Sequence, residues 1–411
     1  MSYGIVEGGI RYSAILYHTA DDFNSGKGIN LTKAIRQLNI SYNILGKYSV
    51  LMSLNGVKYD EYLSVKALSD KPIVHLAIGG NVQSRSRLFA VVSVERTVDP
   101  LTKFSIVNIE LAPYEKVYSP KFSTYMEGSY KDVISSMIDL TFDKSYASLK
   151  PVVNYGNFSS STRIYNLIQR QNLMDYCEEL RKNVVSDEDL TSIMIWDTFS
   201  EINIDSFKNI VTATATDVIL SSSESINQFA AKNITDKNGN PIYYAVSYDS
   251  VMDFDVAKYH HTNETKIYLP NIDRGNLPVF NNINSDDVLE TKIFPSFAGN
   301  NDISYLISGY SKAFSSQLED LLTCSLSTLT VYYPDIPFEP GAVINLMGTS
   351  EHGNSYEKLL IVGIKTDLSN TTGVQLLSAI KLSTVEEFLN NTNNQATQSN
   401  SRKINEKVEF K

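Results

Sequence analysis

A lysine between two glycines is the first stretch whose residue types could bind a ligand. Gly26-Lys27-Gly28 has the small residues and the cation with which a phosphate loop holds phosphate oxygens. No glycine stands five residues before the lysine, however, and no Ser or Thr follows it. The spacing therefore fails the phosphate-loop pattern and indicates an ordinary turn.

Histidines, carboxylates and serines offer the other candidates for chemistry. His260-His261 could ligate a metal, but adjacent residues project in different directions and no His-x-x-x-His or Cys-x-x-Cys accompanies them. Glu178-Glu179 and Asp187-Glu188 are typical of solvated surfaces, and Ser221-Ser222-Ser223 lacks the glycines that flank a nucleophilic serine. We predict no catalytic, cofactor-binding or metal-binding residues, no cofactor, and a protein that is not an enzyme.

The two cysteines, Cys177 and Cys324, lie far apart, each within an apolar pattern of helical type. We expect both to be small core residues rather than a disulfide or a metal pair. Met1-Ser2-Tyr3-Gly4 lacks a basic head followed by an apolar run, and no apolar segment approaches membrane-spanning length. The sequence predicts a protein made in the cytosol without stable membrane association.

Composition and charge limit the function further. A chain of 411 residues is expected to form two to four domains, and 25 Tyr and 17 Phe with many β-branched residues favour β structure. The chain has 36 basic and 46 acidic residues, a net charge of −10. This balance argues against nucleic-acid binding as the main role, because phosphates are gripped by clustered Lys and Arg. It still allows DNA to slide past a repelling wall.

Two stretches of the chain repeat one pattern and organise the rest. Leu88 to Leu111 and Leu359 to Leu382 both predict β-hairpins, and their apolar positions match at an offset of 270 residues with turns of equal length. Because pairing with one buried face fixes the register, the match favours a duplicated β unit. The alternative is that two amphipathic hairpins simply look alike.

Strand patterns fill the first part of the chain. Alternating apolar residues predict strands that are separated by tight turns, at Arg11 to Tyr17, Leu38 to Ile44, Tyr48 to Leu54 and Pro72 to Ile78. With the first hairpin they make an antiparallel barrel or sandwich the expected fold of residues 1 to about 115.

The middle of the chain changes to a mixed α+β pattern. One helical face carries Val133, Ile134, Met137 and Ile138, and a second helix begins after Asn172 with Asp175 at its third position. Short buried strands follow, the first with Ile193, Ile195 and the only tryptophan, Trp196, and the next from Ile202 to Phe207.

The last part returns to strands. Residues 212–220, 242–246, 329–333 and 343–347 have strand patterns, and apolar residues from Tyr310 to Leu322 line one side of a helix. Residues 247–300 are polar and show no clear pattern. The segment 390–401 is rich in Asn, Gln, Ser and Thr, so we expect it to be disordered without a partner.

Several stretches, in their order along the chain, carry a resemblance to a known family. They are residues 31–54, 104–111, 128–134, 192–197 with 205–207, 309–313 ahead of Cys324, 338–344 and the closing hairpin. In these stretches and in the order of its elements, the chain resembles the central hub protein of the baseplate in T-even-type contractile-tailed bacteriophages. The likeness runs to about residue 390, is weakest from 233 to 300, and depends on collinear order rather than on one motif.

The resemblance implies an α+β, mainly β fold with two similar antiparallel, tube-type β-barrels and an α+β insertion domain. It assigns residues 1–117 to the first barrel, 118–212 and 248–304 to the peripheral α+β domain, 213–247 and 305–384 to the second barrel, and 385–411 to a polar tail.

The resemblance also implies a structural role as a baseplate hub. Three chains with two barrels each would form a pseudo-sixfold ring that adapts the threefold central spike to the sixfold tail tube and helps to start tube assembly. The implied partners are a homotrimer of this chain, the spike, the tube or tube-initiator protein, the tape-measure protein and the baseplate wedge. The expected location is the tail baseplate of a virion, assembled in the host cytoplasm.

Phage DNA would pass through such a ring only during ejection. Three copies at −10 each give −30, and acidic residues on the channel wall would repel phosphate, although an acidic exterior fits the same count. An alternative from another class is a tail component that binds or degrades a receptor polysaccharide, with carboxylates and aromatic residues in a cleft. A nuclease or other metal enzyme is the third possibility.

Overall fold

The computed structural model describes most of the chain, with gaps. The described residues are 4–5, 11–55, 59–64, 68, 71–79, 84–98, 105–142, 146–158, 165–184, 186, 191–220, 243–254, 265–268, 290–293, 314–323, 325–331, 338–348, 356–369 and 373–389.

The N-terminal part folds into strands with alternating burial. In β5, for example, Val50, Met52 and Leu54 are buried and the residues between them are not, as expected for a sheet with one face toward a core. The strands are β1 (Gly4–Ile5), β2 (Arg11–Tyr17), β3 (Ile29–Asn30), β4 (Ile35–Asn43), β5 (Tyr48–Asn55), β6 (Ile73–Gly79), β7 (Ser84–Val98) and β8 (Ser105–Pro113). Short helices α1 (Ala20–Asn24), η1 (Thr32–Ala34) and α2 (Tyr59–Tyr62) join them.

The C-terminal part adds a second group of strands. They are β14 (Thr216–Leu220), β15 (Tyr243–Phe254), β18 (Ser325–Val331), β19 (Val343–Gly348), β20 (Tyr356–Ser369) and β21 (Gly373–Lys381). Residues 314–323 and 382–389 are helical. Their pairings run from β14 through β19, β20, β21, β18 and β15 back to β14. β14 is parallel to both of its neighbours, so the sheet is not antiparallel throughout.

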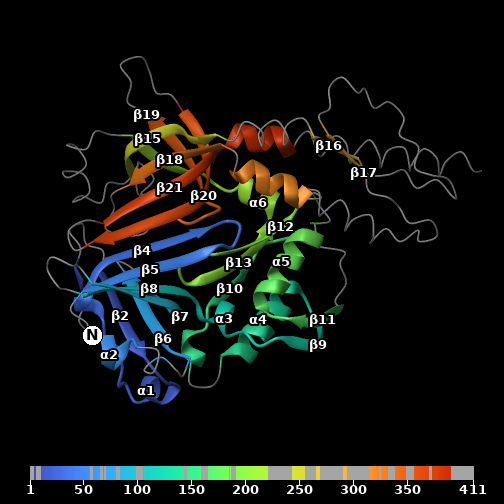
Figure 1. Ribbon diagram of the computed structural model, residues 1–411. Helices are drawn as coiled ribbons and strands as arrows, with labels where there is room; N and C mark the ends of the chain where they lie inside the picture. Colours follow the sequence, from blue (N-terminus) through green and yellow to red (C-terminus); the bar gives the residue numbers. More distant parts are fainter. Residues whose placement is uncertain are drawn as a thin grey trace, which may run out of the picture.

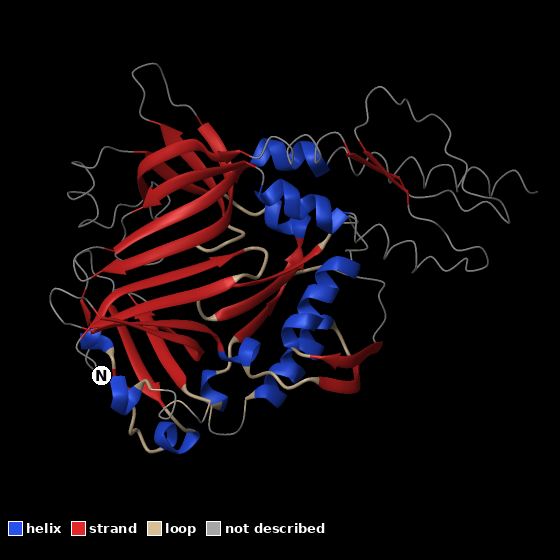
Figure 2. Cartoon of the chain, viewed as in Figure 1, coloured by secondary structure: helices blue, strands red, loops and turns tan. Residues whose placement is uncertain are grey.

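The two groups are joined into one sheet of 14 strands, whereas two similar antiparallel, tube-type β-barrels were expected. The joint is an antiparallel pairing between β4 of the first group and β20 of the second. Figure 1 shows it as the blue strand β4 lying beside the orange-red strands β20 and β21, and Figure 2 shows the sheet as the largest body of the molecule. We call β2 and β4 to β8 the first sheet unit and β14, β15 and β18 to β21 the second sheet unit.

Both sheet units connect their strands in the same order. The first unit has the order β2-β6-β7-β8-β5-β4, and the second has β14-β19-β20-β21-β18-β15. When the six strands of each unit are numbered along the chain, both orders read 1-4-5-6-3-2. An identical non-sequential order in two halves is the expected result of duplication.

Two β-bulges lie at matching places in the units. The pairing of β7 with β8 shifts at Val92, and that of β20 with β21 shifts at Val362, which is 270 positions later. The pairing of β4 with β5 shifts at Arg36, and that of β15 with β18 shifts at Val246, which is 210 positions later. The pairing of β15 with β18 shifts again between Asp249 and Asp253, and this second shift has no counterpart in β4 and β5. Such an extra residue is a specific backbone feature, so two coincidences support duplication more strongly than the apolar pattern does.

The hairpin turns of the units differ in length, which corrects the prediction of equal turns. Val91 pairs with Leu111 in the first unit, and Ile361 pairs with Ala379 in the second. The first strands are thus 270 positions apart and the second strands only 268, so the second turn is shorter by two residues.

A mixed α+β part follows the first sheet unit and packs against it. Its strands are β9 (Phe122–Glu127), β10 (Val152–Tyr155), β11 (Tyr165–Gln171), β12 (Ile193–Asp197) and β13 (Glu201–Ser206), and its helices are α3 (Tyr114–Val117), α4 (Tyr130–Thr141), η2 (Ala147–Leu149), α5 (Leu173–Asn183) and α6 (Phe207–Val211). Both predicted long helices are confirmed, and Asn172 with Asp175 forms a capping box on α5. Phe207 begins α6 instead of continuing a strand.

Two boundaries differ from the predicted ones. β15 stays in the main sheet as far as Phe254, so residues 248–254 do not belong to the peripheral part. Val385, Phe388 and Leu389, which were expected in a polar tail, are helical and buried. Residues 390–401, and with them the predicted disorder, lie outside the described residues, and β16 (Thr265–Tyr268) and β17 (Glu290–Ile293) form a separate parallel pair.

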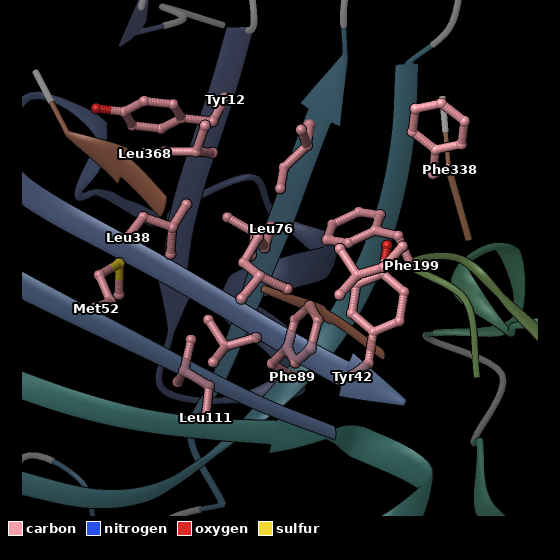
Figure 3. Packing of buried hydrophobic residues seen from close by; sticks show 14 of the residues in the cluster. Tyr12, Leu38, Tyr42, Met52, Leu76, Phe89, Leu111, Phe199, Phe338 and Leu368 are labelled. Carbon is pink, nitrogen blue, oxygen red and sulfur yellow. The ribbon is translucent and has the colours of Figure 1, made fainter. Parts of the chain in front are cut away.

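One apolar core is shared by the two sheet units. It contains residues of β2 and β4 to β8 as well as residues of β14, β15 and β18 to β21. Leu38 of β4 and Leu368 of β20 are Cα partners across the joint, and neither is exposed. Figure 3 shows these two side chains close together in the core. The joint is therefore part of the folded core rather than a surface contact.

Candidate functional site: the junction of the sheet units and its buried ion cluster

The candidate residues near the N-terminus lie in a turn. Gly26 has a φ of +67°, and the N–H of Lys27 donates to the Asp22 carbonyl oxygen at 2.8 Å. A Cβ on Gly28 would lie 2.3 Å from the Ile15 side chain, so the glycine allows close packing there. The N–H of Lys27 is thus used within the turn.

The candidate residues on α5 are in ordinary surface or core settings. Glu178 pairs with Lys182, which lowers the pKa of Glu178, and Glu179 accepts a hydrogen bond from Gln171. Cys177 is a half-buried free thiol, and burial raises its pKa to about 12. His260-His261, Asp187-Glu188, Ser221 to Ser223 and Cys324 lie outside the described residues.

The described residues offer neither a metal-binding cluster nor a membrane-spanning helix. Within those residues, no three His, Cys, Asp or Glu side chains are grouped so that they could hold a metal ion. No helix among them has the length and apolar character needed to cross a membrane.

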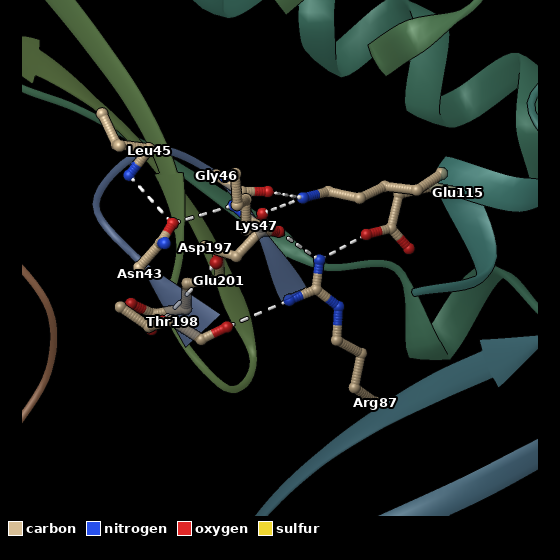
Figure 4. A network of polar contacts seen from close by, with 10 residues as sticks. Asn43, Leu45, Gly46, Lys47, Arg87, Glu115, Asp197, Thr198 and Glu201 are labelled. Atoms are coloured by element: carbon tan, nitrogen blue, oxygen red, sulfur yellow. Dashed lines mark hydrogen bonds and ion pairs between the residues drawn. The ribbon is translucent and has the colours of Figure 1, made fainter. Parts of the chain in front are cut away.

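A buried ion cluster joins the first sheet unit to the α+β part. Arg87 of β7 forms ion pairs with Glu115 of α3 and, at 2.6 Å, with Asp197 of β12. Lys116 pairs with the second oxygen of Asp197 and donates to the Gly46 carbonyl at 2.8 Å. Figure 4 shows Arg87 reaching between these elements. We call Arg87, Glu115, Lys116 and Asp197 the ion cluster.

The charges in the ion cluster balance, two positive against two negative, in a place that excludes water. Arg87, Glu115 and Asp197 are 1%, 0% and 3% exposed. Burial alone would raise the pKa of Asp197, but Lys116 and Arg87 with their hydrogen bonds outweigh burial and lower it. Glu115 and Asp197 likewise raise the pKa of Arg87 against the effect of burial. Asp197 and Arg87 are therefore both charged at neutral pH.

The ion cluster fixes the turn next to the junction. Gly46 lies in the β4–β5 turn with a φ of +78°, and its carbonyl is held by Lys116. Arg87 also donates to the Thr198 carbonyl at 3.0 Å. Because β4 carries the joint to β20, the cluster ties the α+β part to the same strand that connects the sheet units.

A second ion pair crosses between the units. Arg85 of β7 pairs with Glu339, which lies just before β19, and the side chains are 32% and 19% exposed. Burial raises the pKa of Glu339 to about 7, although the Arg85 charge opposes this. Gly341 nearby has a φ of +90°, and a Cβ there would lie 3.2 Å from the Trp196 ring, so this position favours glycine.

Replacing Glu339 with glutamine should remove part of the pH dependence of stability. The folded pKa of Glu339, about 7, lies above its ordinary value of 4.5, so the wild type loses stability as the pH rises through this window. The unfolding free energies of Glu339→Gln and the wild type should be measured in urea at pH 5 and pH 8. From pH 5 to pH 8, the value for the variant should rise relative to that of the wild type by about 1–3 kcal/mol. Glu357→Gln is the control, and an equal gain in both variants would contradict the assignment.

A groove lies beside the ion cluster. It has a volume of about 610 Å³ and runs between the outer face of β7 and β8, α3 and α5. Its lining includes three exposed apolar side chains, Val92, Val117 and Met174. Cys177, Lys116 and Asp197 also face it.

The sequence patterns missed the ion cluster. Its members are separated by as many as 110 positions, and none lies in a recognised motif. One signal was present, because Arg87 shares its strand face with Phe89, which is fully buried. An arginine two residues from a core aromatic in an alternating strand is expected to need buried acidic partners.

Comparisons with known proteins give a consistent result. Residues 8–207 match the family model of phage-tail "Baseplate structural protein, domain 1". A comparison with curated protein sequences found no significant match.

Two solved structures have similar folds. A tail protein from Neisseria meningitidis MC58 has 10% identity and a TM-score of 0.53, and the match covers 90% of this chain and 96% of that one. The 43 kDa tail protein of prophage MuSo2 from Shewanella oneidensis has 11% identity and a TM-score of 0.51, with 91% and 99% covered. Residues 8–207 of this chain therefore match the baseplate structural protein family of phage tails, and about nine tenths of the chain has a fold similar to those of these two phage tail proteins.

Proposed function

We propose that the chain is a non-enzymatic structural subunit of a phage-tail baseplate hub, and that three copies form a pseudo-sixfold ring. The observation that carries this proposal is the identical strand order of the two sheet units, together with the matching β-bulges. The match of residues 8–207 to a baseplate family model supports the setting.

The duplicated sheet unit would let such a ring match two partners of different symmetry. A trimer has threefold symmetry, but two similar units in each chain present six similar units to a neighbour. The ring would thereby adapt a threefold central spike to a sixfold tail tube and help to start the tube. Residues 1–117 and residues 213–247 with 305–384, extended by the rest of β15, would be the ring-forming units. The intervening α+β part would lie outside, toward wedge proteins.

The charge of the chain suits a ring around a DNA channel. A net charge of −10 per chain gives −30 for three copies. Acidic groups on the inner wall would repel phosphate, so DNA and the tape-measure protein would pass without tight binding of the DNA.

The purified chain should be a trimer. Light scattering at micromolar concentration should give three times the chain mass of 45.9 kDa, and electron micrographs should show rings with threefold symmetry. Obligate interfaces of this kind bury large, partly apolar areas, so the trimer should survive dilution to below 1 μM, an order-of-magnitude figure for such contacts. A monomer that also forms no ring with its spike would contradict the proposal.

A further inference from the structure

One edge of β7 has no partner strand within the described part of the chain. Residues 84–90 of β7 pair with β6, and residues 89–98 pair with β8 on the other side. From residue 92 onward, β8 is thus the only neighbour among the described strands. Val92 and Val98 are 51% and 52% exposed on this segment. Unpaired edges with exposed apolar side chains are sites where another strand can add.

The second sheet unit shows what covers the equivalent edge. Residues 363–369 of β20 pair with β4, which belongs to the other unit. Leu368 corresponds to Val98 and Ile364 to Val94 at the offset of 270 set by the bulges. Leu368 is 0% exposed and Val98 is 52% exposed. The same position is therefore covered in one unit and open in the other.

The matching strand for the open edge is β15. β15 corresponds to β4 at an offset of 210, as the second pair of bulges shows. Only residues 243–245 of β15 pair with β14, and after them the described part of β15 pairs with β18 alone. Among its described strands, each chain thus has one open edge of the β7 type and one of the β15 type.

We infer that β7 of one copy pairs antiparallel with β15 of the next copy, in the register of the β4–β20 joint. Within a chain, Leu38 lies opposite Leu368 and Asn39 opposite Asp367. The offsets place Tyr248 opposite Val98 and Asp249 opposite Thr97 between copies. The inference rests on the proposed ring and names the strands that would close it.

The pairing is of the head-to-tail kind. Different edges meet, so the contact repeats in one direction around a ring instead of ending at a symmetric dimer. In a trimer, three joints would be the β4–β20 pairing within chains, and three would be the β7–β15 pairing between them. All six would have the same register as far as Asp249 of β15, where the second shift of that strand begins.

Cross-linking of paired cysteines tests this register. The double variant Thr97→Cys/Asp249→Cys should form covalent dimers and trimers on oxidation or with a short bismaleimide, because opposite residues lie about 4.5–5.5 Å apart at Cβ. Each single variant should give no such products, since a head-to-tail contact brings positions 97 and 249 together but never 97 to 97. The single variants also control for Cys177 and Cys324.

The outcomes separate this interface from the proposed function. A trimeric mass without cross-links in the double variant would overturn the β7–β15 pairing and leave the ring standing. A monomeric wild type that also forms no ring with its spike would overturn both. Cross-links as abundant in a single variant as in the double variant would show that they form to the same position or to Cys177 or Cys324, and would also overturn the pairing.

A charge on the open edge gives an independent test that leaves the fold intact. Val98→Lys should weaken the trimer at least tenfold, roughly the effect of losing one central interface contact. Val152→Lys is the matched control, because Val152 of β10 is 57% exposed and lies far from the edge in sequence. An equal trimer dissociation constant for both variants would overturn the inference.

Discussion

The Arg87→Met variant should lose about 3–5 kcal/mol of unfolding free energy, because it leaves the buried carboxylates of Glu115 and Asp197 with too little positive charge. Glu115 is fully buried, and the guanidinium of Arg87 is its ion-pair partner. Urea unfolding at pH 7, followed by circular dichroism, measures the loss.

Two further variants show whether the loss comes from the uncompensated charge. Lys150→Met removes a cation whose partner Asp139 is 62% exposed at its side chain, so it should cost no more than about 1 kcal/mol. Adding Glu115→Gln to Arg87→Met should recover part of the loss, since the unpaired carboxylate is gone. Similar costs for Arg87→Met and Lys150→Met would mean that the cluster does not stabilise the junction.

Leu368→Ala should cost about 2–5 kcal/mol, while Val98→Ala should change the stability of the dilute monomer by less than about 0.5 kcal/mol. The two residues occupy the same position in the two sheet units, but Leu368 is 0% exposed and Val98 is 52% exposed. Truncating Leu368 leaves a cavity in the core that both units share, whereas truncating Val98 leaves none.

Denaturant unfolding at protein concentrations below the trimer dissociation constant compares these variants where contacts between copies are absent. At high concentration Val98→Ala should also lower the free energy of unfolding relative to the wild type. Assembly stabilises the folded state by mass action, and the variant assembles less tightly. A large loss for Val98→Ala in the dilute protein would show that its edge is already covered within the chain.

Local patterns in the sequence predicted the strands and helices well. Val50, Met52 and Leu54 alternate with polar or exposed residues, and this alternation is enough to identify β5. Asn172 and Asp175 gave the start of α5 because a capping box depends on residues only three positions apart. Such features need no knowledge of the rest of the chain.

The hairpin turns show why register was harder to predict. Side chains in a strand alternate with a period of two, so a shift of two residues leaves every buried position buried. The second strand of the later hairpin is displaced by that amount, and Leu111 corresponds to Ala379 instead of Lys381. Only the observed pairings reveal the difference.

The junction and the ion cluster could not be predicted because they depend on distant parts of the chain. β4 and β20 have ordinary alternating patterns, and neither sequence indicates that the other strand is its neighbour. The parallel direction of β14 likewise depends on its two neighbours, which follow it in the chain by way of segments much longer than a hairpin turn. The partners of Arg87 became visible only with the fold.

The presence of two similar sheet units in each chain limits how many units a closed ring can contain. Each polypeptide contributes its units in covalently joined pairs, so a ring of whole chains always contains an even number of them. A single unit with mutually complementary edges could close with five or seven members. Fusing two units into one gene product removes every odd-numbered ring, whatever the strength of the contacts.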